Sequence, residues 1–242
     1  MNTFFAEFLG TAILILLGNG VVANVVLNQT KGQNSGWIVI TFGWALAVFV
    51  PVLMVGSYSG AHLNPAVTLA FIIKGTVPLE EAGVYIGGQV LGAAVGSFLV
   101  WLNYRHHIEA TENPDAKLAI FATSPAIRNP FQNFFSEVIA TFVFVLAVLL
   151  STTAKVGEQA ASLGSLDALP VALVVLCIGL CLGGTTGYAI NPVRDLVPRM
   201  MHAILPISGK GSSDWGYAWV PVLGPLVGGA LAAALHNVIL KM

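Results

Sequence analysis

Two asparagine–proline pairs stand out in this chain as candidates for a functional site. Asn64-Pro65 and Asn191-Pro192 each follow a stretch of small residues and precede an apolar run. Asparagine is a preferred helix N-cap, and proline is tolerated at the first helical position because its missing N–H would lack a partner there. An asparagine that caps a helix with its side-chain oxygen keeps N–H groups to donate elsewhere. The pairs therefore predict two helix starts with hydrogen-bond donors at their tips.

Both helix starts lie inside long hydrophobic stretches. The apolar runs that follow, Asn64 to about Ile73 and Asn191 to about Ala203, are shorter than the ~20 residues that cross a bilayer. Broken backbone in a membrane is costly unless it lines a cavity. Two interrupted helices at corresponding positions of two halves point to a transport site. We interpret both runs as re-entrant half-helices.

The composition excludes most other classes of protein. Of 242 residues, 56% are hydrophobic and 9% are charged, with a mean hydropathy of +0.83, whereas soluble domains carry about 25% charged residues. A net charge of -1 argues against nucleic-acid binding. Cys177 and Cys181 are better explained as small packing residues than as metal ligands or a disulfide. We find no nucleotide motif, metal cluster or catalytic set, and expect neither an enzyme nor a cofactor.

The elements that must position the two pairs form two repeats. Six spans are expected, at Phe4–Leu27, Trp37–Val55, Leu79–Leu102, Phe131–Thr152, Leu169–Leu182 and Gly216–Leu240. Each half has a glutamate in its first span (Glu7, Glu137), then the half-helix, then a glycine-rich span in which closely spaced glycines predict helix contact. Three crossings per half require the repeats to be inverted.

The predicted fold is therefore an all-α membrane protein with six transmembrane helices and two re-entrant half-helices that meet near the midplane. We expect one channel domain over residues 1–242, with repeats at about 1–105 and 130–242 joined by a loop over 106–129. The segments before the half-helices, Gly56–Leu63 and Gly183–Ile190, are expected to be irregular.

Residues 59–68 read SGAHLNPAVT and residues 191–195 read NPVRD. Two such motifs in an inverted repeat resemble the major intrinsic protein (aquaporin) family, over essentially the whole chain. Asp195, Arg199 and Pro221-Val222 resemble the glycerol facilitators, or aquaglyceroporins, within it. Gly179 stands where strict water channels have histidine, which also favours the glycerol type.

The resemblance implies a passive channel for glycerol, water and other small uncharged solutes that excludes ions and protons. Urea, other polyols and protonated small acids are further candidate solutes. The family also implies a multi-pass protein of the plasma membrane, surrounded by lipid, with cytoplasmic termini and a homotetrameric assembly. Two alternatives stay open: a strictly water-selective aquaporin and a proton-coupled secondary transporter with inverted repeats.

The resemblance also assigns residues to the pore. The selectivity filter would comprise Trp44, Gly179, Tyr188 and Arg194. The NPA motifs would be Asn64, Pro65, Ala66, Asn191, Pro192 and Val193, with Val193 in place of the usual alanine. Pore-lining backbone would come from Gly60, Ala61, His62, Leu63, Gly187, Tyr188, Ala189 and Ile190. Tyr188 replaces the phenylalanine of well-known glycerol facilitators, so its hydroxyl could narrow the filter or bind solute.

Three buried ionisable residues have two interpretations each. Glu7 and Glu137 could be proton relays, or they could accept hydrogen bonds from the irregular backbone before each half-helix; their symmetric placement favours the second role. His62 could sense pH or could be a neutral pore-lining residue held by its neighbours. We favour the neutral residue.

Overall fold

The computed structural model describes residues 1–151, 155–156, 159–160 and 164–241. Its α-helices are α1 (Thr3–Val26), α2 (Trp37–Ser59), α3 (Pro65–Lys74), α4 (Ala82–Ala110), α5 (Pro114–Ala119), α6 (Pro130–Leu150), α7 (Leu169–Cys181), α8 (Pro192–Ile204) and α9 (Trp219–Ile239). Short 3-10 turns at Leu79–Glu81 and Gly164–Ala168 precede α4 and α7. Strands β1 (Lys155–Val156) and β2 (Gln159–Ala160) form one antiparallel pair.

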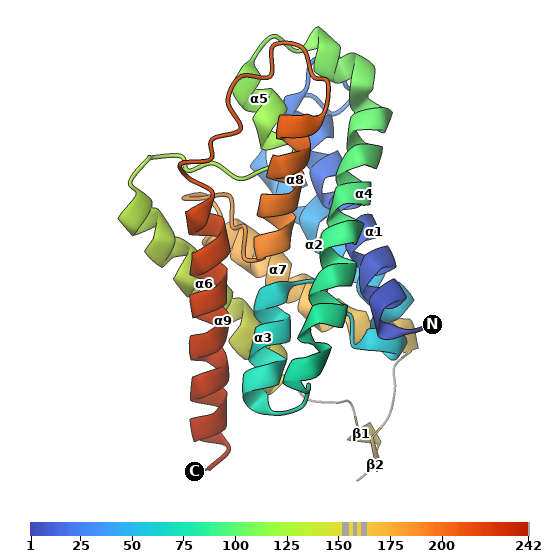
Figure 1. The fold of residues 1–242 in the computed structure, drawn as a ribbon, viewed down its shortest axis with the longest axis vertical. Helices are drawn as coiled ribbons and strands as arrows, with labels where there is room; N and C mark the ends of the chain where they lie inside the picture. Colours follow the sequence, from blue (N-terminus) through green and yellow to red (C-terminus); the bar gives the residue numbers. More distant parts are fainter. Residues whose placement is uncertain (152–154, 157–158, 161–163, 242) are drawn as a thin grey trace.

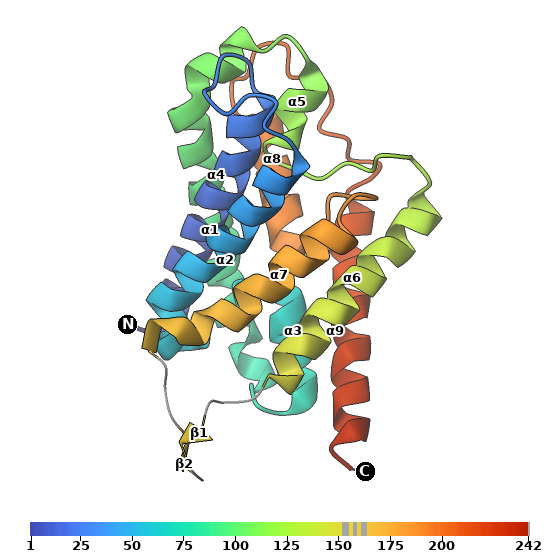
Figure 2. The same ribbon diagram turned by 180° about the vertical axis from the view of Figure 1, so that it is seen from behind.

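The two halves of the chain have the same arrangement of helices. α1 packs against α2 and α4, and α6 packs in the same way against α7 and α9. The short helix of each half contacts the last long helix of the other half, α3 against α9 and α8 against α4. Figure 1 shows α3 and α8 one above the other between the α1/α4 and α6/α9 pairs, and Figure 2 shows α2 and α7 on the opposite face. The predicted architecture of two inverted repeats, each with a half-helix, is confirmed.

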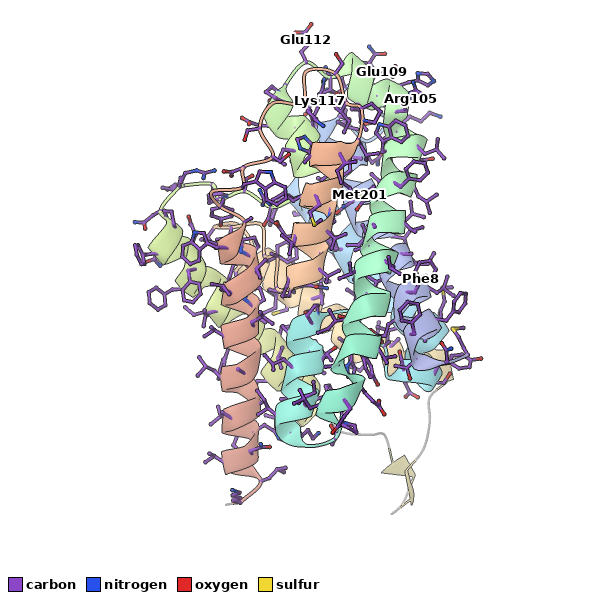
Figure 3. The ribbon with its side chains drawn as sticks, in the orientation of Figure 1. Phe8, Arg105, Glu109, Glu112, Lys117 and Met201 are labelled. Carbon is purple, nitrogen blue, oxygen red and sulfur yellow. The ribbon has the colours of Figure 1, made fainter. Side chains whose placement is uncertain are left out.

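Five helices of the described residues are long and apolar enough to cross a membrane: α1, α2, α4, α6 and α9. The predicted fifth span corresponds to α7, which has 13 helical residues. A helix rises ~1.5 Å per residue, so α7 is shorter than the hydrocarbon core of a bilayer, which is ~30 Å thick. Charged side chains gather at one end of the molecule. Figure 3 labels Arg105, Glu109, Glu112 and Lys117 there, around the end of α4 and α5.

Several predicted boundaries are wrong. α2 continues through Ser59, so the irregular segment expected from Gly56 begins at Gly60, where a left-handed φ of 77° ends the helix. Helical hydrogen bonds are the cheapest way to satisfy backbone in lipid, which explains why Gly56 does not break α2. The expected loop 106–129 contains the last turn of α4 and the whole of α5. Thr152, the predicted end of the fourth span, lies outside the described residues.

Glycines let the long helices of each repeat approach closely. A Cβ at Gly92 of α4 would lie 2.3 Å from the carbonyl oxygen of Phe8 on α1. The equivalent contact in the second repeat joins Gly228 of α9 to Val138 of α6. A Cβ at Gly228 would lie 2.5 Å from the carbonyl oxygen of Val138. Gly83, at the start of α4, has nothing within 4 Å and is not part of this contact. The close approach of α4 to α1 is therefore repeated between α9 and α6.

Candidate functional site

A cavity of about 150 Å³ lies where the two half-helices meet. Its apolar wall consists of Leu14, Val48, Val52, Val67, Phe71, Phe144, Val148, Val171 and Val175. The predicted site residues that line it are Trp44, Gly60, Ala61, His62, Leu63, Asn64, Tyr188, Ala189, Ile190, Asn191 and Arg194. The predicted residues outside its wall are Pro65, Ala66, Gly179, Gly187, Pro192 and Val193. A mostly apolar wall with a few converging polar groups suits a small amphipathic solute.

The two asparagines hold the half-helices tip to tip. The Asn64 side chain donates a hydrogen bond to the carbonyl oxygen of Ile190 at 2.8 Å, and Asn191 donates to that of Leu63, also at 2.8 Å. Their side-chain oxygens cap their own helices; that of Asn64 accepts from the N–H of Ala66 at 2.8 Å. An amide nitrogen carries two hydrogens. Each asparagine therefore keeps one N–H, and both residues line the cavity.

The segments before the half-helices, which we call the lead-ins (residues 60–63 and 187–190), have unusual backbone. Non-glycine residues adopt positive φ at symmetric positions: Ala61 (49°), Leu63 (52°), Tyr188 (38°) and Ile190 (44°). Such angles are uncommon outside glycine and cost about 1–3 kcal/mol each. Strain of this kind persists only where surrounding contacts hold the backbone. Side chains from α1, α4 and α6 provide those contacts.

Glu7 holds the first lead-in. Its Oε1 accepts the backbone N–H of His62 at 3.0 Å and the hydroxyl of Ser59 at 2.6 Å, while Oε2 accepts the N–H of Leu63 at 2.7 Å. The side-chain amide of Gln89 on α4 also donates to Oε2, at 2.8 Å. Every one of these contacts lies inside the protein, and Glu7 is 0% exposed.

Glu137 holds the second lead-in in the same way. Its Oε1 accepts the hydroxyl of Thr186 at 2.7 Å and the N–H of Ala189 at 3.0 Å, and Oε2 accepts the N–H of Ile190 at 2.9 Å. Neither glutamate lines the cavity. This geometry favours a structural role over a proton relay, because both oxygens of each carboxylate are engaged by the lead-ins.

Replacing Glu7 with alanine is expected to lower the yield of folded protein and to leave the selectivity of the folded fraction unchanged. The substitution leaves the N–H groups of His62 and Leu63 buried without an acceptor, at ~1–3 kcal/mol for each unsatisfied group. The yield is measured as the monodisperse peak in size-exclusion chromatography, and selectivity as the ratio of glycerol to water permeability. Glu109→Ala, at an exposed glutamate of α4, is the control. A normal yield with a changed ratio would contradict the structural role.

Most of the lead-in carbonyl oxygens are without a hydrogen-bond partner among the described residues. Within the described residues, six lead-in carbonyl oxygens accept no hydrogen bond from the protein: Gly60, Ala61, His62, Gly187, Tyr188 and Ala189. All of these residues except Gly187 belong to the cavity wall. A buried carbonyl without a partner is costly unless water or a ligand supplies one. The free oxygens can therefore accept hydrogen bonds from hydroxyl groups that pass through the cavity.

Trp44 and Arg194 stack on one another at the cavity wall. The guanidinium carbon of Arg194 lies 4.2 Å from the centre of the Trp44 ring, within the range of a cation–π contact. The indole fills space left by Gly18 on α1, where a Cβ would lie 2.3 Å from the ring. Among the described residues, Nη1 of Arg194 has no hydrogen-bond partner. The pair combines an apolar face with a cationic group that retains donors.

Gly179 lies behind Tyr188 rather than on the cavity wall. A Cβ at Gly179 would lie 3.0 Å from Cζ of Tyr188 and 2.9 Å from Cγ2 of Thr41. The Tyr188 hydroxyl is buried against this glycine and has no hydrogen-bond partner among the described residues. The expectation that the hydroxyl narrows the filter or binds solute therefore does not match its position, because the ring tip points into the space that Gly179 leaves.

His62 is held in place by three neighbours. Its Nδ1 lies 3.1 Å from the hydroxyl oxygen of Thr68, and the ring stacks between Tyr85 at 4.4 Å and Phe71 at 4.8 Å. The Thr68 hydroxyl hydrogen is donated to the carbonyl of Asn64 at 3.2 Å. Nδ1 must therefore be the donor in its contact, an assignment that follows from the hydrogen-bond network. Because a ring that donates from Nδ1 can be neutral or charged, the neutral form of His62 stays a prediction, and the structure places the residue on the cavity wall.

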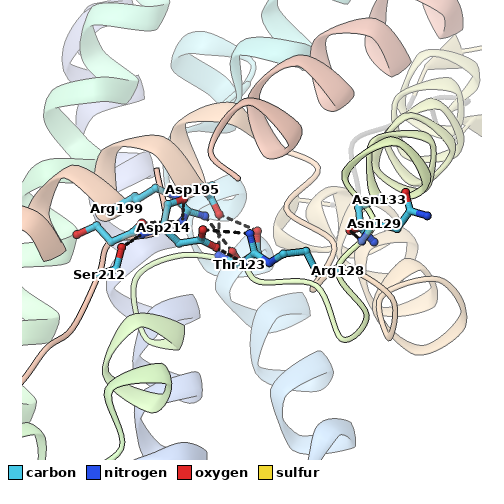
Figure 4. Close-up of polar contacts among 9 residues, drawn as sticks. Thr123, Arg128, Asn129, Asn133, Asp195, Arg199, Ser212 and Asp214 are labelled. Carbon is cyan, nitrogen blue, oxygen red and sulfur yellow. Dashed lines mark hydrogen bonds and ion pairs between the residues drawn. The ribbon is translucent and has the colours of Figure 1, made fainter. Parts of the chain in front are cut away.

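An ion pair beside Arg194 connects α8 to two loops (Figure 4). The Arg199 Nε donates to Oδ1 of Asp195 at 2.8 Å, and both side chains are 0% exposed. Thr123, in the loop after α5, donates its N–H and hydroxyl to Oδ2 of Asp195 at 2.6 and 2.7 Å. Arg199 also donates to the carbonyl of Ser213, before α9, at 2.9 Å. Sequence reasoning singled out Asp195 and Arg199 but missed Thr123, for which no local signal exists.

The comparisons with known proteins agree with this geometry. The profile of a family described as Major intrinsic protein matches residues 1–236. The chain is 53% identical over 237 residues to the probable glycerol uptake facilitator protein of Thermotoga maritima, covering 98% of this chain and 99% of that protein. It is 52% identical over 241 residues to the glycerol uptake facilitator protein of Streptococcus pneumoniae, covering 98% and 99%. The X-ray structure of the aquaglyceroporin from Plasmodium falciparum matches with a TM-score of 0.84 and 33% identity, over 98% of this chain and 96% of that one.

Proposed function

The chain belongs to the major intrinsic protein family, and from this premise we propose that it is a passive channel for glycerol, water and other small uncharged solutes. The observation that carries the proposal is one cavity lined by Asn64, Asn191, the Trp44–Arg194 pair and lead-in residues whose carbonyl oxygens mostly lack partners among the described residues. A polyol has hydroxyl groups on one side and carbon on the other, so it matches a wall that is partly polar and partly apolar. Relatives named as glycerol uptake facilitators support the same solute.

Ions and protons would be excluded electrostatically. The N-termini of α3 and α8 meet at the cavity, and each helix N-terminus carries about half a positive charge. Positive helix ends and an arginine in a pore raise the barrier for cations and protons. Water that accepts a hydrogen bond from each of Asn64 and Asn191 turns its oxygen toward them, which interrupts a chain of proton transfer.

The rival functions fit the site less well. A proton-coupled transporter that uses a carboxylate relay requires that carboxylate in the solute path, whereas the buried carboxylates of Glu7 and Glu137 face the lead-ins outside the cavity wall. A strictly water-selective channel requires a narrower filter than glycine at position 179 provides. Family membership also supports a homotetramer in the plasma membrane with cytoplasmic termini, and these remain part of the proposal.

Stopped-flow light scattering on reconstituted vesicles tests the proposal. Vesicles with the purified protein should shrink faster than empty vesicles in a sucrose gradient, and should reswell faster than empty vesicles in a glycerol gradient. A protonophore should leave both rates unchanged, because the flux is passive. Fast water flow without glycerol entry would overturn the glycerol assignment, and glycerol entry that depends on a proton gradient would favour the transporter.

A further inference from the structure

The Tyr188 ring is enclosed on the side that faces away from the cavity. Trp37, the first residue of α2, meets it edge to face with ring centres 5.7 Å apart and an interplanar angle of 84°. Gly179 in the last turn of α7 and Gly183 just after it lie against the same ring. None of these three residues lines the cavity, whereas Tyr188 does. A larger side chain on this side would therefore press on the ring.

Gly183 leaves no room for a side chain. A Cβ there would lie 2.4 Å from Cδ1 of Tyr188, 2.7 Å from the carbonyl oxygen of Gly179 and 3.0 Å from the Trp37 ring. Real Cβ atoms do not approach other atoms so closely, so an added methyl group must displace a neighbour. The neighbouring Gly184 has nothing within 4 Å of its Cβ position. Position 183 therefore requires glycine because of the space that Tyr188 occupies.

Trp37 ties the end of α7 to α2. Its indole N–H donates to the carbonyl oxygen of Gly179 at 3.1 Å. The last four carbonyl groups of a helix lack partners within that helix, and α7 ends at Cys181. The indole therefore satisfies one of these carbonyls, and the same side chain contacts both Gly179 and the Tyr188 ring.

We propose that Trp37 and Gly183 are positioning residues of the filter, which set the width of the solute path through the placement of Tyr188. This inference rests on the proposed function. Gly179, Gly183 and Trp37 form a cradle that keeps the ring back from the cavity, on whose wall Arg194 and Trp44 also lie. The width available to solute then depends on three residues that no solute touches.

Gly183→Ala and Gly184→Ala form the matched pair of variants that tests the proposal. Both are reconstituted into vesicles, and permeability is measured for water, glycerol and the longer polyols erythritol and ribitol. Gly183→Ala is expected to reduce glycerol permeability by about tenfold and to reduce water permeability less, because the ring is pushed into the path. Gly184→Ala should match the unaltered protein. A Gly183→Ala channel that folds and passes every solute at the unaltered rate would overturn the proposal.

Trp37→Phe is expected to let the Tyr188 ring move away from the cavity. The shorter ring lacks the N–H donor and frees space behind Tyr188, so erythritol permeability is expected to rise relative to that of glycerol. Trp219→Phe, at an α9 tryptophan stacked on Phe134, controls for the loss of an indole elsewhere. If folded Trp37→Phe keeps the ratio of erythritol to glycerol permeability of the unaltered protein, the proposed role of Trp37 is contradicted. If Gly183→Ala does not fold, the result for Trp37→Phe tests the proposal by itself.

A double-substitution cycle shows whether the effect passes through Tyr188. In a Tyr188→Ala background no ring can be displaced, so adding Gly183→Ala should change the glycerol-to-water ratio no further. An undiminished effect of Gly183→Ala in that background would mean that the glycine acts elsewhere. If the unaltered protein conducts water but not glycerol, the proposed function fails, and the same comparisons of water permeability still test the cradle.

Discussion

Gly179→His is expected to reduce glycerol permeability by at least about tenfold, which corresponds to a barrier higher by ~1.4 kcal/mol, with a smaller effect on water. Even the first atom of the new side chain would lie 3.0 Å from Cζ of Tyr188 and 2.9 Å from Thr41. The imidazole requires several more atoms of space between α7 and Tyr188. The Tyr188 ring must therefore move into the cavity, where the larger solute loses its path first.

The measurement is the ratio of glycerol to water permeability of reconstituted protein, corrected for the amount of folded channel. Gly184→His is the control, because the Cβ position at Gly184 has open space around it. Equal loss of glycerol and water flux in Gly179→His would indicate general damage rather than a narrower filter. Retained glycerol flux would show that the size of the residue at position 179 does not limit solute passage.

The second large effect is expected at the ion pair beside the filter. Arg199→Met should destabilise the folded protein by ~3–5 kcal/mol, because removing one partner of a buried pair leaves an uncompensated charge. Asp195 is 0% exposed and, among the described residues, would keep only the two bonds from Thr123. The carbonyl oxygens of Thr123 and Ser213 would lose their donors as well.

The expected readout is a large fall in the temperature at which the detergent-solubilised protein loses its monodisperse peak. Arg128→Met is the matched control, since Arg128 pairs with Asp214 but its side chain is 52% exposed. An exposed pair is worth about 0–1 kcal/mol. The double variant Asp195→Leu/Arg199→Met should recover part of the loss, because neither charge of the pair remains to be buried alone. Equal losses for Arg199→Met and Arg128→Met would contradict a special role for the buried pair.

The two lead-ins, which stand at corresponding places in the two repeats, have backbone strain at the same positions. Residues 61 and 63 of one lead-in and residues 188 and 190 of the other adopt positive φ. Glu7 and Glu137 hold these segments with equivalent hydrogen bonds. The lead-ins leave six of their eight carbonyl oxygens without protein partners among the described residues, and a path for hydroxyl groups requires such acceptors. The two glutamates therefore serve the channel from outside the cavity.

Local chemistry made much of this protein predictable. Long apolar runs identify membrane spans because backbone and side chains must both suit lipid. Asn64 and Asn191 cap α3 and α8 as expected, since a cap involves only residues of the first turn. The recurring order of glutamate, asparagine–proline and glycine stripe predicts an inverted repeat. Boundaries such as that of α2 were less accurate, because the preference of a membrane for helix outweighs a few glycine and serine residues.

Other features depend on segments that are distant in the chain and meet only in the folded protein. Asn64 donates to Ile190 and Asn191 to Leu63 across the centre of the molecule. Thr123 joins Asp195, and Gly179 lies behind Tyr188 instead of on the cavity wall. A sequence pattern records which residues are close along the chain. The width of the filter depends on distances between helices, and packing alone decides those distances.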